Sequence, residues 1–371
     1  MRILFYSDSV PIGGHELMSI RLANVLSEST DFELAFMGPV TFSELLSHKV
    51  KIINNIVKPR PLNGSFGMFF VMDYFAIQKE LNKYKPDLIV VCQGTIELGI
   101  KAVIVARFLG IKVISYIPLV IDLVSTKSKF FPRLRNLINR YLYKLPDGYI
   151  TISSYHKKQL QKKSDKDISL LHNWAEHQDL KSRPIIEERR DLFEWINHEK
   201  ASGQTVILII GRIEFKHKQQ DKFLDCLDKG MLNSNISVVF AGIGSDSLTL
   251  EDLIKRTNTN RVYYAGMVKD VRLLYSSADG LCICSSFEGV PLVLLEAVNW
   301  SLPVFSFDFD AVRDYLPSNL LVRNQDFEQL IQCINRYDFS AGRIKYSMSY
   351  KSPTIGDVDA ILKQIVKTVK G

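Results

Sequence analysis

Two glutamates lie eight positions apart in the stretch SSFEGVPLVLLEAVNWSLPVF, which runs from residue 285 to residue 305. Glu288 stands in a turn after an apolar strand pattern, and Glu296 lies within the apolar helix pattern that follows. An ionised carboxylate only accepts hydrogen bonds, so both side chains suit the hydroxyl groups of a ribose or a hexose. The alternative is that Glu288 interacts with the helix dipole and that Glu296 is merely exposed. The apolar neighbours of Glu296 instead favour a partly buried carboxylate, which needs hydrogen-bond donors.

A basic cluster follows another apolar strand pattern. The stretch GRIEFKHKQQD contains Arg212, Lys216, His217 and Lys218. Such a cluster is usually a solvated surface. At the carboxyl end of a strand, however, two cations can hold a diphosphate, and arginine can do so with two parallel hydrogen bonds. The position of the cluster therefore indicates an anion-binding site.

Two glycine-containing loops complete the candidate chemistry. In SDSVPIGGHELMSI, Gly13 and Gly14 permit close approach of a ligand, and the N-terminus of the following helix favours an anion or a hydroxyl group. The spacing is not that of a GxGxxG dinucleotide-binding motif, and a plain tight turn is the alternative. In AGIGSDSLTLEDL at 241–253, Asp246 or Ser247 is either a helix N-cap or a ligand contact.

The elements that position these residues alternate along the chain. Short apolar runs predict strands that are buried on both faces, and amphipathic segments such as 15–26 and 245–257 predict helices between them. This rhythm is typical of doubly wound parallel sheets, in which ligands bind at the carboxyl ends of the strands. The predicted strands are 2–7, 33–38, 87–93, 112–117, 148–153, 205–211, 237–244, 261–266, 280–286 and 303–308.

The alternation breaks once, in the polar and strand-poor stretch 172–204. We therefore expect an α/β protein with two Rossmann-like doubly wound domains that face a central cleft. The expected parts are a first domain at 1–172, a linker with a helical insert at 173–204, a second domain at 205–350, and a C-terminal helix at 351–371 that packs back toward the first domain.

Composition bounds the class of protein. The chain has 371 residues, of which 46% are hydrophobic, so it can form two sizeable cores. Its five cysteines are scattered, which is typical of reduced core residues in a cytoplasmic protein. The sequence opens without a signal-peptide pattern and has no apolar run long enough to span a membrane. The net charge of +7 suits a phosphorylated ligand or an anionic surface, whereas no nucleic-acid-binding motif is present.

Together these loops resemble the family 4 retaining glycosyltransferases, which have the GT-B architecture. The similarity is strong over 205–315, and in the first half of the chain it depends on the glycine loop and the order of strands. The matching pieces are IGGHE, GRIEFKHKQQD, AGIGSD, VYYAGMVKDV and SSFEGVPLVLLEAVNWSLPV, of which the last contains the Glu-X7-Glu motif.

The resemblance implies a role for each charged residue. Arg212 and Lys218 would hold the diphosphate of a nucleotide sugar and neutralise charge as the nucleotide leaves, without a metal ion. Glu296 would bind the ribose hydroxyls, and Glu288 would contact the transferred sugar. Of these four residues, the resemblance implies that Arg212, Lys218 and Glu288 are catalytic.

The resemblance also implies contacts that are made largely by the backbone. Those in the second domain, with phosphate, sugar or base, are Gly242, Gly266, Met267, Val268, Gly289, Val290 and Leu292; those in the first domain, with phosphate or acceptor, are Gly13, Gly14 and His15.

The chain departs from the family pattern at one position of the first domain. The family usually carries a histidine near the transferred sugar, in the loop after the strand that corresponds to 113–119, where this chain has Tyr116. His15 is a candidate substitute. The Asp-X-Asp pattern at Asp308 and Asp310 follows the strand after the Glu-X7-Glu helix, so we interpret it as a polar loop rather than a metal site.

A basic and aromatic segment, KSKFFPRLRNLINRYLYK at 127–144, predicts contact with an anionic membrane surface. A solvated helix with one core-facing stripe is the alternative. Reversing the charges of Lys127, Lys129, Arg133 and Arg135 is expected to release the protein from anionic liposomes.

The expected function is therefore transfer of a hexosyl unit, with retention, from a nucleoside diphosphate sugar to a glycan or lipid-linked acceptor in surface polysaccharide or glycolipid synthesis. The expected location is the cytoplasm, with peripheral contact at the inner face of the plasma membrane. Two alternatives stay open: a non-catalytic subunit that binds nucleotide sugars, and a GT-B nucleotide-sugar epimerase.

Overall fold

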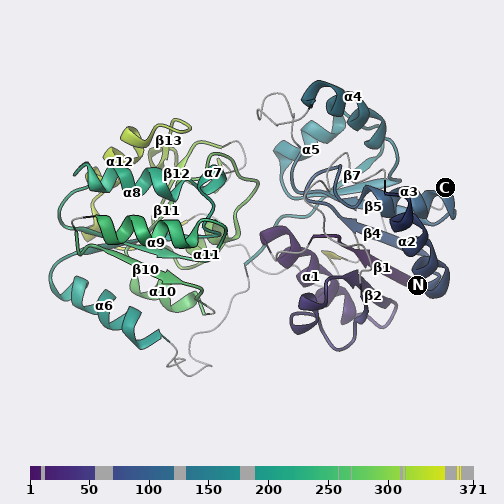
Figure 1. Cartoon of the computed structure of the whole chain (residues 1–371), viewed down its shortest axis with the longest axis horizontal. Helices are drawn as coiled ribbons and strands as arrows, with labels where there is room; N and C mark the ends of the chain where they lie inside the picture. The colour runs from purple at the N-terminus through teal and green to yellow at the C-terminus, as the bar shows by residue number, and fades with distance from the viewer. Residues whose placement is uncertain are drawn as a thin grey trace. The chain divides into compact units, whose positions relative to one another are not determined.

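The computed structural model describes most of the chain: residues 1–9, 13–54, 70–120, 131–175, 189–257, 259–268, 270–309, 312–313, 315–346, 357–358 and 360. The chain divides into two compact units, one of Met1–Asn173 with Pro353–Gly371 and the other of Trp174–Ser352 (Figure 1). We call them the first and second units and describe each by itself. The predicted cleft between them stays a prediction. The predicted helix at 351–371 lies outside the described residues, apart from Asp357, Val358 and Ala360.

The first unit is built on a seven-stranded parallel sheet with the strand order β3-β2-β1-β4-β5-β6-β7. Helices α2 and α3 pack against each other (Figure 1). In chain order the elements are β1 (Arg2–Tyr6), α1 (Gly14–Ser27), β2 (Glu33–Gly38), β3 (Lys51–Asn54), α2 (Val71–Tyr84), β4 (Leu88–Cys92), α3 (Ile100–Phe108), β5 (Lys112–Tyr116), α4 (Pro132–Leu142), β6 (Gly148–Thr151), α5 (Ser154–Gln161) and β7 (Asp167–Leu170).

The second unit has a six-stranded parallel sheet with the order β10-β9-β8-β11-β12-β13. Helices α8, α9 and α12 lie side by side (Figure 1). The elements are α6 (Arg190–Ala201), β8 (Thr205–Ile210), α7 (Phe215–Lys218), α8 (Gln220–Asp228), β9 (Ile236–Ala241), α9 (Ser247–Arg256), β10 (Val262–Gly266), α10 (Arg272–Ser277), β11 (Gly280–Ile283), α11 (Leu292–Asn299), β12 (Val304–Phe307), β13 (Leu321–Val322) and α12 (Phe327–Arg336).

The prediction of doubly wound parallel sheets is confirmed. Central strands such as β4 and β9 are buried along their whole length, which explains why their sequences are continuous apolar runs. All ten predicted strands are present, with ends that differ by a few residues.

Three strands were not predicted. β3 is exposed along most of its length and lies at the edge of its sheet, so its sequence lacks a buried run. β7 is the opposite edge strand, and β13 has only two residues. Edge strands have one unpaired side, and their short, partly polar sequences resemble loops.

No helix among the described residues is both long enough and apolar enough to cross a lipid bilayer. All five cysteines are free thiols, as expected.

Candidate active site

The parallel pairing of β8 with β11 places two predicted site residues in contact at the carboxyl ends of these strands. Lys218, the last residue of α7, forms an ion pair with Oε1 of Glu288 in the loop after β11. The hydroxyl group of Ser285 donates a hydrogen bond to the same oxygen, at 2.7 Å. The side chains of Lys218 and Glu288 are only 26% and 16% exposed, so water screens the pair incompletely. Two charged residues 70 positions apart in the sequence thus form one polar centre.

The two loops that carry this pair are joined by further hydrogen bonds. The backbone amide and the hydroxyl group of Ser286 both donate to the carbonyl of His217, at 2.7 and 3.1 Å. The thiol of Cys284 donates to the carbonyl of Lys218 at 3.1 Å, and burial raises the pKa of this thiol to about 12. The His217 ring packs edge-on against Phe287, with ring centres 4.8 Å apart. The position of Lys218 is therefore fixed by the β11 loop.

Arg212 lies two residues after β8 and remains the more open cation. Its side chain is 44% exposed, and its Nη1 atom is 3.9 Å from Oε2 of Glu214. The other oxygen of Glu214 is 3.4 Å from Nε2 of His217. We did not single out Glu214 from the sequence, because an acidic residue within a basic loop has no diagnostic spacing. The site therefore contains two carboxylates, Glu214 and Glu288, that partly compensate its cations.

Glu296 is half-buried within α11, as its apolar neighbours led us to expect. The hydroxyl group of Tyr275 donates a hydrogen bond to Oε2 of Glu296, at 2.8 Å. Tyr275 was not predicted as a site residue, since a tyrosine in an amphipathic helix reads as an ordinary core residue. The protein itself thus supplies one of the donors that a partly buried carboxylate needs.

Helix α11 begins at Leu292, and Pro291 is its N-cap rather than a member of its first turn. No described side chain caps this helix. The first amide groups of a helix have no acceptor within the helix, and they favour negative charge. Gly289 and Val290, which precede the cap, are part of the same loop as Glu288.

The loops after β8, β9 and β10 pack backbone against backbone. The amide of Gly242 donates to the carbonyl of Gly266 at 2.7 Å. A Cβ atom at Gly242 would lie 2.0 Å from the carbonyl oxygen of Gly211, and the φ of +134° at Gly242 also requires glycine. Past β10, Met267 is 57% exposed while Val268 is buried. The structure therefore gathers most of the predicted backbone contacts along one edge of the sheet.

Asp246 and Ser247 both make hydrogen bonds within the second unit. The Asp246 carboxylate accepts a hydrogen bond from the amide of Phe215, at 2.8 Å, and so caps α7 rather than its own helix. The Ser247 hydroxyl accepts from the amide of Gly244, also at 2.8 Å. Asp246 therefore supports the short helix that ends at Lys218.

In the first unit, Gly13 is the N-cap of α1, and Gly14 is the first helical residue. The amide of Gly13 donates to the Glu16 carboxylate at 3.0 Å. The φ of −118° at Gly13 is open to any residue, so the backbone conformation does not require glycine here. What remains is the absence of a side chain, which permits close approach.

His15 packs against the ring of Tyr116, with ring centres 5.1 Å apart. Burial lowers the pKa of His15 to about 4, with the nearby Glu16 carboxylate and the Cys92 carbonyl opposing the shift. The imidazole is therefore neutral at pH 7. The structure thus places the candidate substitute, His15, against Tyr116.

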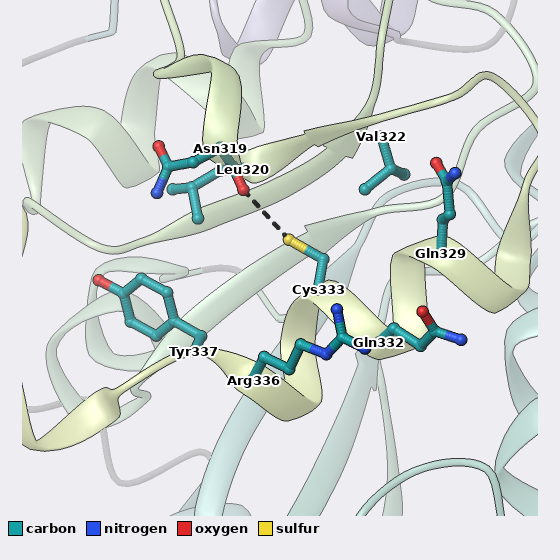
Figure 2. Close-up of a pocket in the computed structure, with 8 residues that line it drawn as sticks. All are labelled: Asn319, Leu320, Val322, Gln329, Gln332, Cys333, Arg336 and Tyr337. Atoms are coloured by element: carbon teal, nitrogen blue, oxygen red, sulfur yellow. Dashed lines mark hydrogen bonds between the residues drawn. The ribbon is translucent and has the colours of Figure 1, made fainter.

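A cavity elsewhere in the second unit is separate from this site (Figure 2). It has a volume of about 440 Å³ and lies between β13 and α12. The thiol of Cys333 donates to the carbonyl of Asn319 across it, at 3.4 Å. None of the predicted site residues lines this cavity; its lining residues are Asn319, Leu320, Val322, Gln329, Gln332, Cys333, Arg336 and Tyr337.

Metal ligands do not cluster in the described part of the chain, where no three His, Cys, Asp or Glu side chains are grouped to hold an ion. Asp308 binds Arg313, with 2.6 Å between Oδ1 and Nε. Asp310, the second member of the Asp-X-Asp pattern, lies outside the described residues.

Comparison with known proteins agrees with this geometry. Residues 204–337 match the family "Glycosyl transferases group 1". An α-1,4-N-acetyl-D-galactosaminyltransferase of Campylobacter jejuni, which acts on an undecaprenol-linked glycan by its name, is 26% identical over 325 residues, or 86% of this chain and 83% of the relative. An uncharacterized glycosyltransferase of Haemophilus influenzae is 22% identical over 97% of this chain and 96% of its own.

Solved structures share the fold over the full chain. Sucrose-phosphate synthase from Thermosynechococcus elongatus has a TM-score of 0.73 at 16% identity and covers 100% of this chain and 98% of its own. HepE of Anabaena, in complex with UDP and glucose, has a TM-score of 0.68 at 17% identity, with 99% and 97% covered. The two parallel α/β sheets and the polar centre at Lys218 and Glu288 define a protein of the GT-B class. Within that class, residues 204–337 are similar to the glycosyl transferases group 1 family.

Proposed function

We propose that this protein transfers a hexosyl unit from a nucleoside diphosphate sugar to a glycan or lipid-linked acceptor, with retention of configuration. The catalytic residues are Arg212, Lys218 and Glu288. The observation that carries the proposal is the meeting of Lys218 with Glu288 at the carboxyl ends of β8 and β11, beside the uncapped N-terminus of α11. The Campylobacter relative, whose name specifies an undecaprenol-linked acceptor, supports the acceptor class.

The chemistry follows from these charges. The bond between the anomeric carbon of the sugar and the diphosphate oxygen breaks, and its electron pair stays on that oxygen. Lys218, Arg212 and the first amides of α11 stabilise the growing negative charge, because they are fixed before the reaction begins. The hydroxyl oxygen of the acceptor forms the new bond to the anomeric carbon, and its proton passes to the departing diphosphate oxygen.

In this proposal Glu288 exchanges its partners when the donor binds. In the absence of donor its carboxylate is held by Lys218 and Ser285. An arriving diphosphate attracts Lys218, and Glu288 then accepts hydrogen bonds from the hydroxyl groups of the transferred sugar. Glu296, positioned within α11, binds the ribose hydroxyls.

The test uses the full chain with UDP-, GDP- and ADP-hexoses and measures the nucleotide that is released. Lys218→Ala and Glu288→Ala should each lower turnover by about 100-fold or more, as removal of a group that stabilises the transition state does. The matched control is Lys216→Ala, which removes an exposed lysine from the same short helix. Turnover that survives in the Lys218 and Glu288 variants at the level of the Lys216 variant would contradict the assignment.

The same assay separates the two alternative functions. An epimerase releases an altered nucleotide sugar with donor alone, and product analysis without any acceptor detects it. A non-catalytic subunit binds the nucleotide and turns nothing over. The fold does not decide between transferase and epimerase, since UDP-GlcNAc 2-epimerase from Methanocaldococcus jannaschii also aligns, with a TM-score of 0.59 at 14% identity.

We further propose that α4 contacts an anionic membrane surface. Four large apolar side chains on this helix or at its N-cap are exposed by half or more: Phe131, Leu134, Leu137 and Tyr141. Arg133 and Arg140 lie on the same helix and add positive charge, which suits an acidic lipid surface. Arg135 has a different role from the one expected: its guanidinium group binds the Glu97 carboxylate and is only 16% exposed. Lys127 and Lys129 lie outside the described residues.

A further inference from the structure

Tyr275 holds the Glu296 carboxylate from a neighbouring helix. It lies in α10, is 1% exposed, and donates its hydroxyl hydrogen to Oε2 of Glu296 at 2.8 Å. Burial, together with the Glu296 charge, raises the pKa of Tyr275 well above its usual value. The phenol therefore stays protonated and remains a donor at neutral pH.

This hydrogen bond restricts the carboxylate. A glutamate side chain within a helix can turn about three bonds, and each orientation presents its oxygens differently. A bond from a buried, immobile phenol to one oxygen selects one orientation and fixes the plane of the group. Two neighbouring hydroxyl groups, such as those of a ribose, need such a fixed pair of acceptor oxygens.

Arg343 fixes the two helices that carry this pair. Its guanidinium group donates to the carbonyls of Tyr275 and Ser276 at the end of α10, both at 2.9 Å. It also donates to the carbonyl of Trp300, the C-cap of α11, at 2.7 Å. The last carbonyls of a helix have no partner within the helix, so one side chain satisfies groups of both helices at once. The spacing between α10 and α11 is thereby set from a third segment of the chain.

We propose that Tyr275 is a positioning residue that orients Glu296 for the ribose of the donor, and that it sets the preference of the site for ribonucleotides over nucleotides without ribose hydroxyls. Arg343 maintains this arrangement by joining α10 to α11. The proposal rests on the proposed function, in which Glu296 binds the ribose.

The experiment compares the affinity of the full chain for UDP, GDP or ADP, whichever binds, with that for the 2′,3′-dideoxy form of the same nucleotide, by calorimetry. The wild type should prefer the ribonucleotide. Tyr275→Phe should lower that preference by about tenfold, through weaker ribonucleotide binding alone, because the hydroxyl group of Tyr275 touches the carboxylate and not the base or phosphates. The matched control is Tyr346→Phe, which removes a phenol that donates to the carbonyl of Leu302 at 2.7 Å in the same unit; it should keep the wild-type preference.

Further variants test whether Tyr275 acts through Glu296, and one of them replaces Tyr275→Phe if that variant does not fold. Glu296→Gln should also lose the preference, and adding Tyr275→Phe to it should change nothing more. If Tyr275→Phe fails to unfold cooperatively, Arg343→Lys takes its place: it keeps the charge, cannot reach carbonyls of both helices, and should lower the preference in the same direction.

Each outcome bears on one claim. A wild type that binds none of the three nucleotides overturns the proposed function and this inference with it. A wild type that binds without distinguishing the dideoxy form, or a Tyr275→Phe or Arg343→Lys chain that is folded and keeps the full preference, overturns this inference and leaves the proposed transfer reaction standing.

Discussion

At the scale of single residues, the site is defined by charges that are already paired. Lys218 is bound to Glu288, and Arg212 lies 3.9 Å from Glu214, before any ligand arrives. A nucleotide must therefore compete with carboxylates of the protein for the same cations. This competition predicts the direction in which the affinity for a nucleotide changes when one of these carboxylates is neutralised.

Neutralising Glu288 should strengthen the binding of a nucleoside diphosphate even as it abolishes transfer. Glu288→Gln keeps the shape of the side chain but releases Lys218 from its counter-charge, so the affinity for UDP should rise by about twofold to fivefold. Lys218→Met should have the opposite effect on affinity. Calorimetric titration of both variants provides the check, and weaker UDP binding by Glu288→Gln would show that the pair does not compete with the ligand.

Protonation of His15 should make the first unit less stable in acid. The folded pKa of about 4 lies below the ordinary value of 6.5, so the unfolded chain binds more protons between these values. The free energy of unfolding should therefore fall as the pH drops from 6.5 toward 4, by about 3 kcal/mol at most from this residue. Urea unfolding at several pH values should show a flatter profile for His15→Gln.

The control for this measurement is His48→Gln, because His48 is an exposed histidine of the same unit. Its profile should match that of the wild type. If His15→Gln retains the full acid sensitivity, the neutral state of His15 does not contribute to stability.

At the scale of elements, loops from three strands are held together by close backbone contacts as well as by side chains. A Cβ atom at Gly244 would lie 2.2 Å from the carbonyl oxygen of Ile213, the residue that follows Arg212. Motifs in the sequence predicted which loops meet, since carboxyl ends of parallel strands lie at one edge. They could not predict that Asp246 caps α7, because that depends on how closely two loops approach in space.

The same limit explains why Tyr275 and Ser285 were not predicted as partners of Glu296 and Glu288. Hydrogen bonds between residues distant in sequence leave no periodic pattern, and serine and tyrosine are common in helices and turns. The charges that we propose to be catalytic, by contrast, lie in motifs of fixed spacing. The strands with continuous apolar runs were predicted correctly, whereas β3 and β13 were missed because little of either sequence is buried in a recognisable run.

Gly244→Ala should disturb nucleotide binding as well as stability. The added methyl group must displace the Ile213 carbonyl, which shifts Arg212 and costs about 1–3 kcal/mol of stability. Gly203→Ala is the matched control: its Cβ meets nothing within 4 Å, and only its φ of +79° opposes the change. Both variants should unfold at lower urea concentration, but only Gly244→Ala should bind UDP more weakly. Equal UDP affinity of the two would show that this contact does not position Arg212.

At the scale of the whole molecule, the exposed apolar side chains of α4 should determine whether the protein associates with membranes. Leu134→Glu combined with Leu137→Glu replaces two half-exposed leucines by charges, so binding to vesicles that contain phosphatidylglycerol should fall by about tenfold or more. Sedimentation with such vesicles provides the measurement. Vesicles of phosphatidylcholine alone should bind the wild type weakly.

Phe108→Glu serves as the control for that experiment, because Phe108 is 81% exposed at the end of α3 in the same unit. This variant should sediment like the wild type. Equal release by both substitutions, or none by either, would remove α4 as the membrane contact.

The hydrogen bonds that Arg343 makes to α10 and α11 affect the order in which the nascent chain can fold. Tyr275 and Glu296 are translated well before Arg343, which follows the last strand and the last long helix of the second unit. Until Arg343 has left the ribosome, it cannot donate hydrogen bonds to the carbonyl groups at the ends of α10 and α11. The nascent chain can therefore form its sheet early, but the hydrogen bonds that join α10 to α11 form only among the final steps of its synthesis.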